Sequence, residues 1–115
     1  MAKISDRREA ERFHVKLNAR WEGVLAQRTG SIVDISSTGC FLLTSDEVTT
    51  KELIRIEIQL PTERWIRLWA EVVYQISEMG FALRFTGSTE TEQTMLYLTL
   101  DLMAENAAAS TDGKR

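Results

Sequence analysis

The segment RWIRLWAEVVYQISEMGFALRF, residues 64–85, alternates apolar and polar side chains in two runs separated by Glu78-Met79-Gly80. One parity of the first run is apolar, comprising Ile66, Leu68, Ala70, Val72, Tyr74 and Ile76. In the second run, Phe81, Leu83 and Phe85 share a face. A period of two is typical of a strand that buries one side and exposes the other. The segment therefore predicts two consecutive β-strands joined by a tight turn.

The same kind of pattern recurs upstream. The further segments predicted as strands are Phe13–Trp21, Ser31–Ile35, Cys40–Leu43 and Leu53–Leu60, the last of them ended by Pro61. We expect Gly23 to break or bulge the first strand, residues 24–26 to continue it, and Arg28-Thr29-Gly30 to form a turn. About six short strands joined by tight turns favour an antiparallel barrel or a sandwich.

The two ends of the chain differ from this middle. Residues 1–12 are polar and lack an apolar period, which predicts a flexible N-terminal arm. Thr89 and Glu92 have the spacing of a capping box, which predicts that a helix begins there. Its expected apolar stripe is Met95, Leu98 and Leu102, widened by Leu96, Leu100 and Met103. We expect this helix to close the open edge of the sheet and residues 104–115 to form a flexible tail.

The charge of the chain is distributed unevenly. The 115 residues, enough for one domain, carry a formal net charge of -3. Residues 1–28 hold seven Lys and Arg against four Asp and Glu, and residues 29–115 hold seven against thirteen. An acidic average disfavours a protein that holds nucleic acid by bulk positive charge. Any anionic ligand must therefore be bound by local charge.

Residue counts also restrict the chemistry. A single cysteine, Cys40, predicts no internal disulfide, and a single histidine, His14, leaves no partner for a metal site. No catalytic constellation is evident, so we expect no enzyme activity, no metal and no cofactor. No apolar run approaches the roughly 20 residues that span a bilayer, and no signal region follows Arg7 and Arg8. A cytoplasmic protein without membrane insertion is the resulting expectation.

The densest group of cations is Arg7, Arg8 and Arg12 in the N-terminal arm. Arginine presents a planar fork of donors that fits phosphate or the Hoogsteen edge of guanine. In an extended arm, positions four apart point the same way and lie about 13 Å apart, which suits a ligand with several anionic and purine groups. The alternative is a solvated basic arm.

A second motif is Asp34-x-Ser36-x-x-Gly39 at the end of a predicted strand. Asp34 and Ser36 share one parity and are expected to face outward, where a carboxylate and a hydroxyl could accept or donate hydrogen bonds to guanine. Gly39 would permit a positive φ or a close approach of the backbone. The alternative is a local turn in which Asp34 or Ser36 satisfies neighbouring N–H groups.

The combination of RxxxR, DxSxxG and the later run Met79–Phe85 (MGFALRF) resembles the PilZ domain family over residues 6–103. The resemblance implies a bacterial cyclic di-GMP receptor built as a six-stranded antiparallel β-barrel with a C-terminal helix. It also implies that Arg8 and Arg12 grip guanine and phosphate, while Asp34, Ser36 and Gly39 contact a guanine. Arg7, immediately before RxxxR, favours two intercalated ligands over one.

Two further side chains are candidates for this site. Trp69 lies on the polar parity of its strand, where it could stack on a base or pack under the arm or helix. Arg84 could add charge to the site or pair with an acidic neighbour. We expect a non-catalytic receptor that signals to a separate downstream protein. The alternatives are an adaptor of the same fold that needs no nucleotide and, less favoured, a barrel that binds single-stranded nucleic acid.

Overall fold

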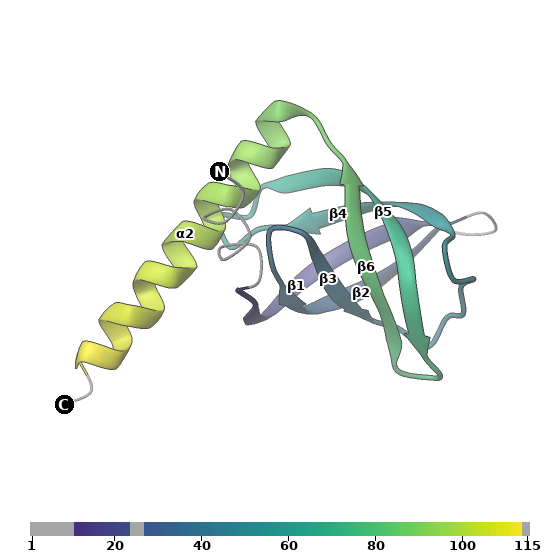
Figure 1. Ribbon diagram of the computed structural model, residues 1–115, viewed down its shortest axis with the longest axis horizontal. Coiled ribbons are helices and arrows are strands. Elements are labelled where there is room, and N and C mark those ends of the chain that lie inside the picture. The colour runs from purple at the N-terminus through teal and green to yellow at the C-terminus, as the bar shows by residue number, and fades with distance from the viewer. Residues whose placement is uncertain (1–10, 24–26, 114–115) are drawn as a thin grey trace.

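The computed structural model describes residues 11–23 and 27–113, with side chains only as far as residue 106. Six strands precede one helix within these residues (Figure 1). The strands are β1 (Phe13–Glu22), β2 (Gln27–Ile35), β3 (Gly39–Leu43), β4 (Leu53–Gln59), β5 (Trp65–Ile76) and β6 (Gly80–Gly87). The helix is α2 (Glu90–Gly113).

The six strands form a closed antiparallel barrel in the order β1-β2-β3-β6-β5-β4. The first strand closes the sheet by pairing with β4, with Ala19 opposite Ile58 and Trp21 opposite Ile56. The predicted six-stranded barrel with a C-terminal helix is therefore confirmed, and the sandwich is excluded. The helix does not close an open edge, as the sequence suggested, because pairing between β1 and β4 leaves no edge there.

The interior of the barrel is filled by the apolar parities of the strands. Ile54, Ile56, Ile58 and Ile66 are all 0% exposed, and burial of each such side chain contributes about 1.5–3 kcal/mol. Trp21 is 4% exposed. Its ring meets that of Phe81 edge to face, with centroids 5.2 Å apart and planes at 83°.

The connection between β1 and β2 lies earlier in the chain than the sequence suggested. Arg28-Thr29-Gly30 is part of β2 rather than a turn, since Arg28 pairs with Trp21 and Gln27 with Glu22. Long-range pairing along β1 here outweighs the local turn preference of glycine. The expected continuation of the first strand over 24–26 lies outside the described residues.

Two β-bulges change which residues face the core. In β2, an extra residue at Val33 lets both Ile32 and Ile35 face inward, at 0% and 1% exposure. In β5, the register with β6 shifts between Val72 and Tyr74. Tyr74 and Ile76 were expected on the core face with Val72, but they are 53% and 44% exposed. A bulge inverts every later position of its strand, which corrects that expectation.

The helix begins as its capping box predicts. Thr89 Oγ1 accepts the Glu92 N–H at 3.1 Å, and Glu92 Oε1 accepts the Thr89 N–H at 3.4 Å. Leu96 and Leu100 face the barrel at 2% and 7% exposure. Of the predicted stripe, Leu98 and Leu102 instead face outward at 58% and 54%.

The helix α2 extends past the barrel and ends at Gly113 rather than near Met103 (Figure 1). The alanine-rich sequence at 107–109 favours this continuation. Within the described part of the chain, none of the helical sequence combines the length and hydropathy required to traverse a bilayer.

Candidate functional site

The structure brings one residue of each motif into direct contact. Arg12, which immediately precedes β1, donates from Nη2 to Asp34 Oδ1 at 2.6 Å. The register of β1 against β2 explains the contact, because His14 is opposite Asp34. The two side chains are 48% and 28% exposed, so both remain accessible to a ligand. An ion pair at this exposure contributes about 0–1 kcal/mol and is readily exchanged.

Ser36 lies in the turn between β2 and β3 and is fully buried, at 0% exposure. Its Oγ accepts the N–H groups of Thr38 and Gly39, both at 3.2 Å. Its own N–H donates to the Gly39 carbonyl at 2.8 Å. The expectation that Ser36 faces outward with Asp34 is therefore wrong. Ser36 lies past the end of β2 at Ile35, where the alternation of the strand no longer applies, and its hydroxyl satisfies backbone donors of the turn.

Position 39 requires glycine because β3 and β6 approach each other too closely there for a side chain. A Cβ built at this position would lie 2.1 Å from the Leu83 carbonyl oxygen on β6. The described glycines have no positive φ, so of the two reasons considered for Gly39 only the close approach applies. Gly39 thus holds β3 against β6 directly beside Asp34, where Arg84 is its paired residue.

These residues surround a surface cavity of about 410 Å³. This volume lies within the roughly 300–1,000 Å³ typical of small-molecule sites. One wall is polar and includes Arg12, Asp34 and Thr38. The rest of the wall is largely apolar, apart from Arg84. The apolar residues that line the cavity are Phe41, Val73, Tyr74, Ala82 and Leu83. The cavity can therefore combine ionic recognition with the face of a planar group.

The apolar wall was missed in the sequence. Tyr74 reaches the cavity only because of the bulge in β5, which periodicity does not reveal. Its ring contacts that of Phe41, with centroids 6.4 Å apart. Phe41 was detectable, because it follows Gly39 by two positions and so shares its side of β3.

A family model described as the PilZ domain matches residues 6–100. The chain belongs to the PilZ domain family. The matched range includes both motifs, from before Arg8 to α2. No curated protein sequence matches the chain.

Solved structures share the fold of this PilZ domain. YcgR from Escherichia coli, solved in complex with c-di-GMP, has a TM-score of 0.75 at 15% identity. The Bacillus subtilis inhibitor of motility MotI (DgrA) has a TM-score of 0.72 at 21% identity. The similarities cover 91% and 83% of this chain, but only 49% and 50% of those chains. The PilZ domain of CeSA from a cellulose-synthesizing bacterium has a TM-score of 0.64 at 15% identity, covering 81% and 98%.

The remaining candidate residues divide into three groups. Arg84 lines the cavity of the PilZ domain, and its Nη2 donates to Glu71 Oε1 across the strands. Trp69 is outward-facing at 47% exposure but is not among the residues that line the cavity. Its ring lies under the guanidinium of Arg55 at 5.4 Å. Arg7 and Arg8 lie outside the described residues.

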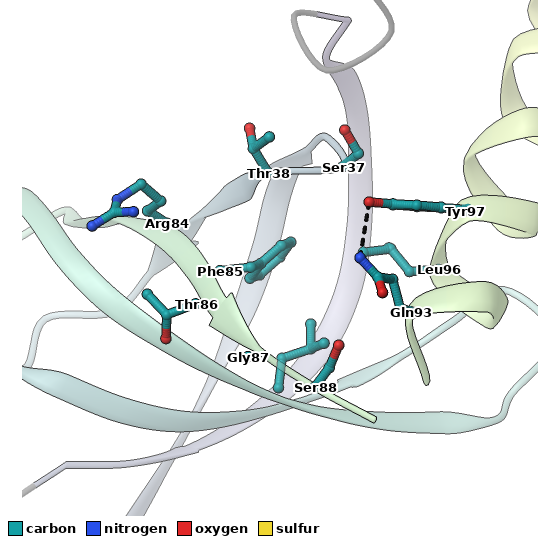
Figure 2. A pocket seen from close by; sticks show the side chains of 11 residues that line it. Ser37, Thr38, Arg84, Phe85, Thr86, Gly87, Ser88, Gln93, Leu96 and Tyr97 are labelled. Atoms are coloured by element: carbon teal, nitrogen blue, oxygen red, sulfur yellow. Dashed lines mark hydrogen bonds between the residues drawn. The ribbon is translucent and has the colours of Figure 1, made fainter. Parts of the chain in front are cut away.

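A second cavity, of about 420 Å³, lies between the end of β6 and the start of α2 (Figure 2). On the side of this cavity that α2 forms, Gln93 Nε2 donates to Tyr97 Oη at 3.1 Å. Ser37 and Thr38 border it from the β2–β3 turn. Arg84 and Thr38 line both cavities, so the two cavities meet at the DxSxxG turn.

The thiol of the single cysteine, Cys40, belongs to β3. Cys40 is 0% exposed, and its burial, aided by the charge of Asp34 and opposed by Arg12, raises the pKa of its thiol. It is therefore a neutral core residue at physiological pH. The described residues contain no cluster of three or more His, Cys, Asp or Glu suited to a metal ion.

Proposed function

We propose that this PilZ domain is a non-catalytic, cytoplasmic receptor for cyclic di-GMP. The observation that carries the proposal is the contact of Arg12 with Asp34 in the wall of the cavity, which Gly39 also lines. Family membership supports it, since the relative YcgR was solved in complex with this nucleotide. The PilZ domain model that matches the chain indicates no catalytic family.

The two partners of the ion pair have complementary roles toward a guanine nucleotide. The Asp34 carboxylate is a pure acceptor and suits the adjacent N1 and N2 donors of guanine. The Arg12 guanidinium is a pure donor and suits phosphate or the guanine O6 and N7. Arg12 therefore exchanges one hydrogen-bond acceptor for another, and Asp34 one donor for another, so that neither charged group is left without a hydrogen bond.

The energetic balance favours this exchange. Breaking the exposed pair costs about 0–1 kcal/mol, whereas each hydrogen bond to a charged group contributes about 1.5–3 kcal/mol. The aromatic ring of Tyr74 provides a surface on the apolar wall for the base. In this proposal Arg8 grips the ligand together with Arg12, and Arg7 favours an intercalated pair of nucleotides. Ordering of the arm over the ligand then changes the surface presented to a downstream protein.

Calorimetric titration with cyclic di-GMP tests the proposal and reports both affinity and the number of ligands. We expect saturable binding, with Arg12→Ala weakening it by about 1.5–3 kcal/mol, or roughly ten- to more than a hundredfold. Arg20→Ala is a matched control, because Arg20 is also 48% exposed and pairs with Glu57 at 3.1 Å, on β4. We expect unchanged affinity for Arg20→Ala.

Two outcomes would contradict the proposal. A folded sample that releases no heat at high micromolar nucleotide refutes the receptor and favours the adaptor that needs no nucleotide. Equal affinities for the wild type and Arg12→Ala would show that the contact with Asp34 is unrelated to ligand binding.

A further inference from the structure

The turn between β5 and β6 lies at the end of the barrel away from α2 (Figure 1), and several apolar side chains at this turn and on the strands beside it are exposed. Leu43 is 38% exposed, Ile76 44% and Met79 50%. They lie together because Gly80 is paired with Leu43 on one side and Ile76 on the other. Tyr74 extends the group toward the cavity. We refer to Leu43, Tyr74, Ile76 and Met79 as the hairpin strip.

The bulge in β5 turns Tyr74 and Ile76 of this strip away from the core. Without the register shift between Val72 and Tyr74, Ile76 would face the core, as its parity in the sequence indicates. β-Bulges are over-represented at sheet edges and next to active sites, where they redirect a side chain. Scattered exposed apolar residues are ordinary, but a contiguous group marks a site of interaction.

The charges around the hairpin strip are acidic. Glu78 directly precedes Met79 in the turn, and Glu47 lies in the connection after β3. Gln75 Nε2 donates to the Asp46 carbonyl at 3.2 Å, which holds this connection beside β5. Arg28 pairs with Asp46 at 3.4 Å, whereas within the described chain no ion pair includes Glu47 or Glu78. The apolar strip is thus bordered by available carboxylates.

We propose that the hairpin strip is a docking surface for a partner protein, bound through an amphipathic helix whose apolar side chains are flanked by Lys or Arg. The strip supplies apolar contact area, including Met and Tyr, which are enriched in protein interfaces. Glu47 and Glu78 supply charge complementarity, which orients the partner and speeds its association. This inference goes beyond nucleotide binding and does not depend on it.

The test uses two synthetic amphipathic helices with identical leucine faces, one carrying lysine on its polar face and the other glutamate. Titrations follow the side-chain methyl signals of the full chain by NMR. We expect the lysine peptide to shift the methyls of Ile76, Met79 and Leu43 and to leave those of Leu98 and Leu102 on α2 unchanged. The glutamate peptide is expected not to bind.

Two double variants distinguish binding at the hairpin strip from nonspecific hydrophobic binding elsewhere on the protein. Ile76→Ser with Met79→Ser is expected to weaken binding of the lysine peptide at least tenfold. The control, Leu98→Ser with Leu102→Ser, removes leucines that are more exposed and is expected to leave binding unchanged. All four positions face solvent, and thermal unfolding confirms that each variant is folded.

Several results would overturn the proposal. These are equal affinities for the two double variants, shifts centred on α2, or equal binding of the two peptides. Concentration-dependent broadening of the strip methyls without peptide would instead show that a second copy of the chain covers this surface.

Discussion

Replacement of Ser36 by alanine should destabilise the fold by about 2 kcal/mol. The hydroxyl accepts the N–H groups of Thr38 and Gly39 at 3.2 Å, within a turn where Ser36 is 0% exposed. Alanine leaves the N–H of buried Gly39 without an acceptor, at a cost of about 1–3 kcal/mol. Loss of the hydrogen bond from the Thr38 N–H costs less, because Thr38 is exposed and water can replace the serine hydroxyl as the acceptor.

The neighbouring serine provides a matched control. Ser37 Oγ is buried but has no hydrogen-bond partner among the described residues. Loss of that hydroxyl removes no protein hydrogen bond, so Ser37→Ala should change the free energy of unfolding by less than about 0.5 kcal/mol. The two substitutions are chemically identical and adjacent, but only Ser36→Ala removes hydrogen bonds to backbone N–H groups.

Urea denaturation monitored by the fluorescence of buried Trp21 measures both variants. A loss of about 2 kcal/mol in Ser36→Ala corresponds to a decrease of roughly 8 °C in Tm at this chain length. The reasoning fails if the two variants are equally stable within 0.5 kcal/mol, or if Ser37→Ala is the less stable one. Either result would show that the Ser36 hydroxyl does not hold the turn.

Three further predictions concern Gly39, Cys40 and Trp69. Gly39→Ala should cost about 1–3 kcal/mol of stability, because its Cβ would meet the Leu83 oxygen at 2.1 Å. Gly87→Ala, whose nearest contact would be 3.9 Å, should be neutral in the same urea experiment, and equal costs would contradict the steric argument. Because burial raises the pKa of the Cys40 thiol, its contribution to stability should be complete below about pH 8.5 and decline above it, as only the unfolded chain ionises. Unfolding measured from pH 8 to 10 should show this decline in the wild type and a weaker one in Cys40→Ala; identical slopes would contradict it. Trp69→Ala should leave cyclic di-GMP affinity within about twofold by calorimetry, since Trp69 does not line the cavity, and a tenfold loss would place its ring at the ligand.

Much of the barrel could be predicted because one-sided burial leaves a period of two in the sequence. The parity of Phe13–Trp21 and of the first half of β5 matches the buried faces. The errors in the predicted strand boundaries occur where pairing between strands, rather than local sequence preference, determines the structure. The register of β1 with β2 extends β2 back to Gln27 through a glycine that locally favours a turn.

The candidate site was predictable to a smaller extent. The residue types of RxxxR and DxSxxG indicate anion and guanine chemistry, whereas the contact between Arg12 and Asp34 depends on the register of β1 against β2. The burial of Ser36 depends on where β2 ends, and the exposure of Tyr74 depends on a single extra residue in β5; neither follows from the local alternation. Insertion of one residue inverts the side-chain direction without changing the composition.

The sequence by itself determined a β-rich chain of one domain, the capped start of its helix and the concentration of arginines in an otherwise acidic protein. These properties follow from local periodicity and composition. Only the tertiary structure decided that the sheet closes through β1 and β4 and that Arg12 meets Asp34. It also decided that the hairpin strip faces solvent. Those features depend on the register between strands, which is fixed by contacts between residues far apart in the chain.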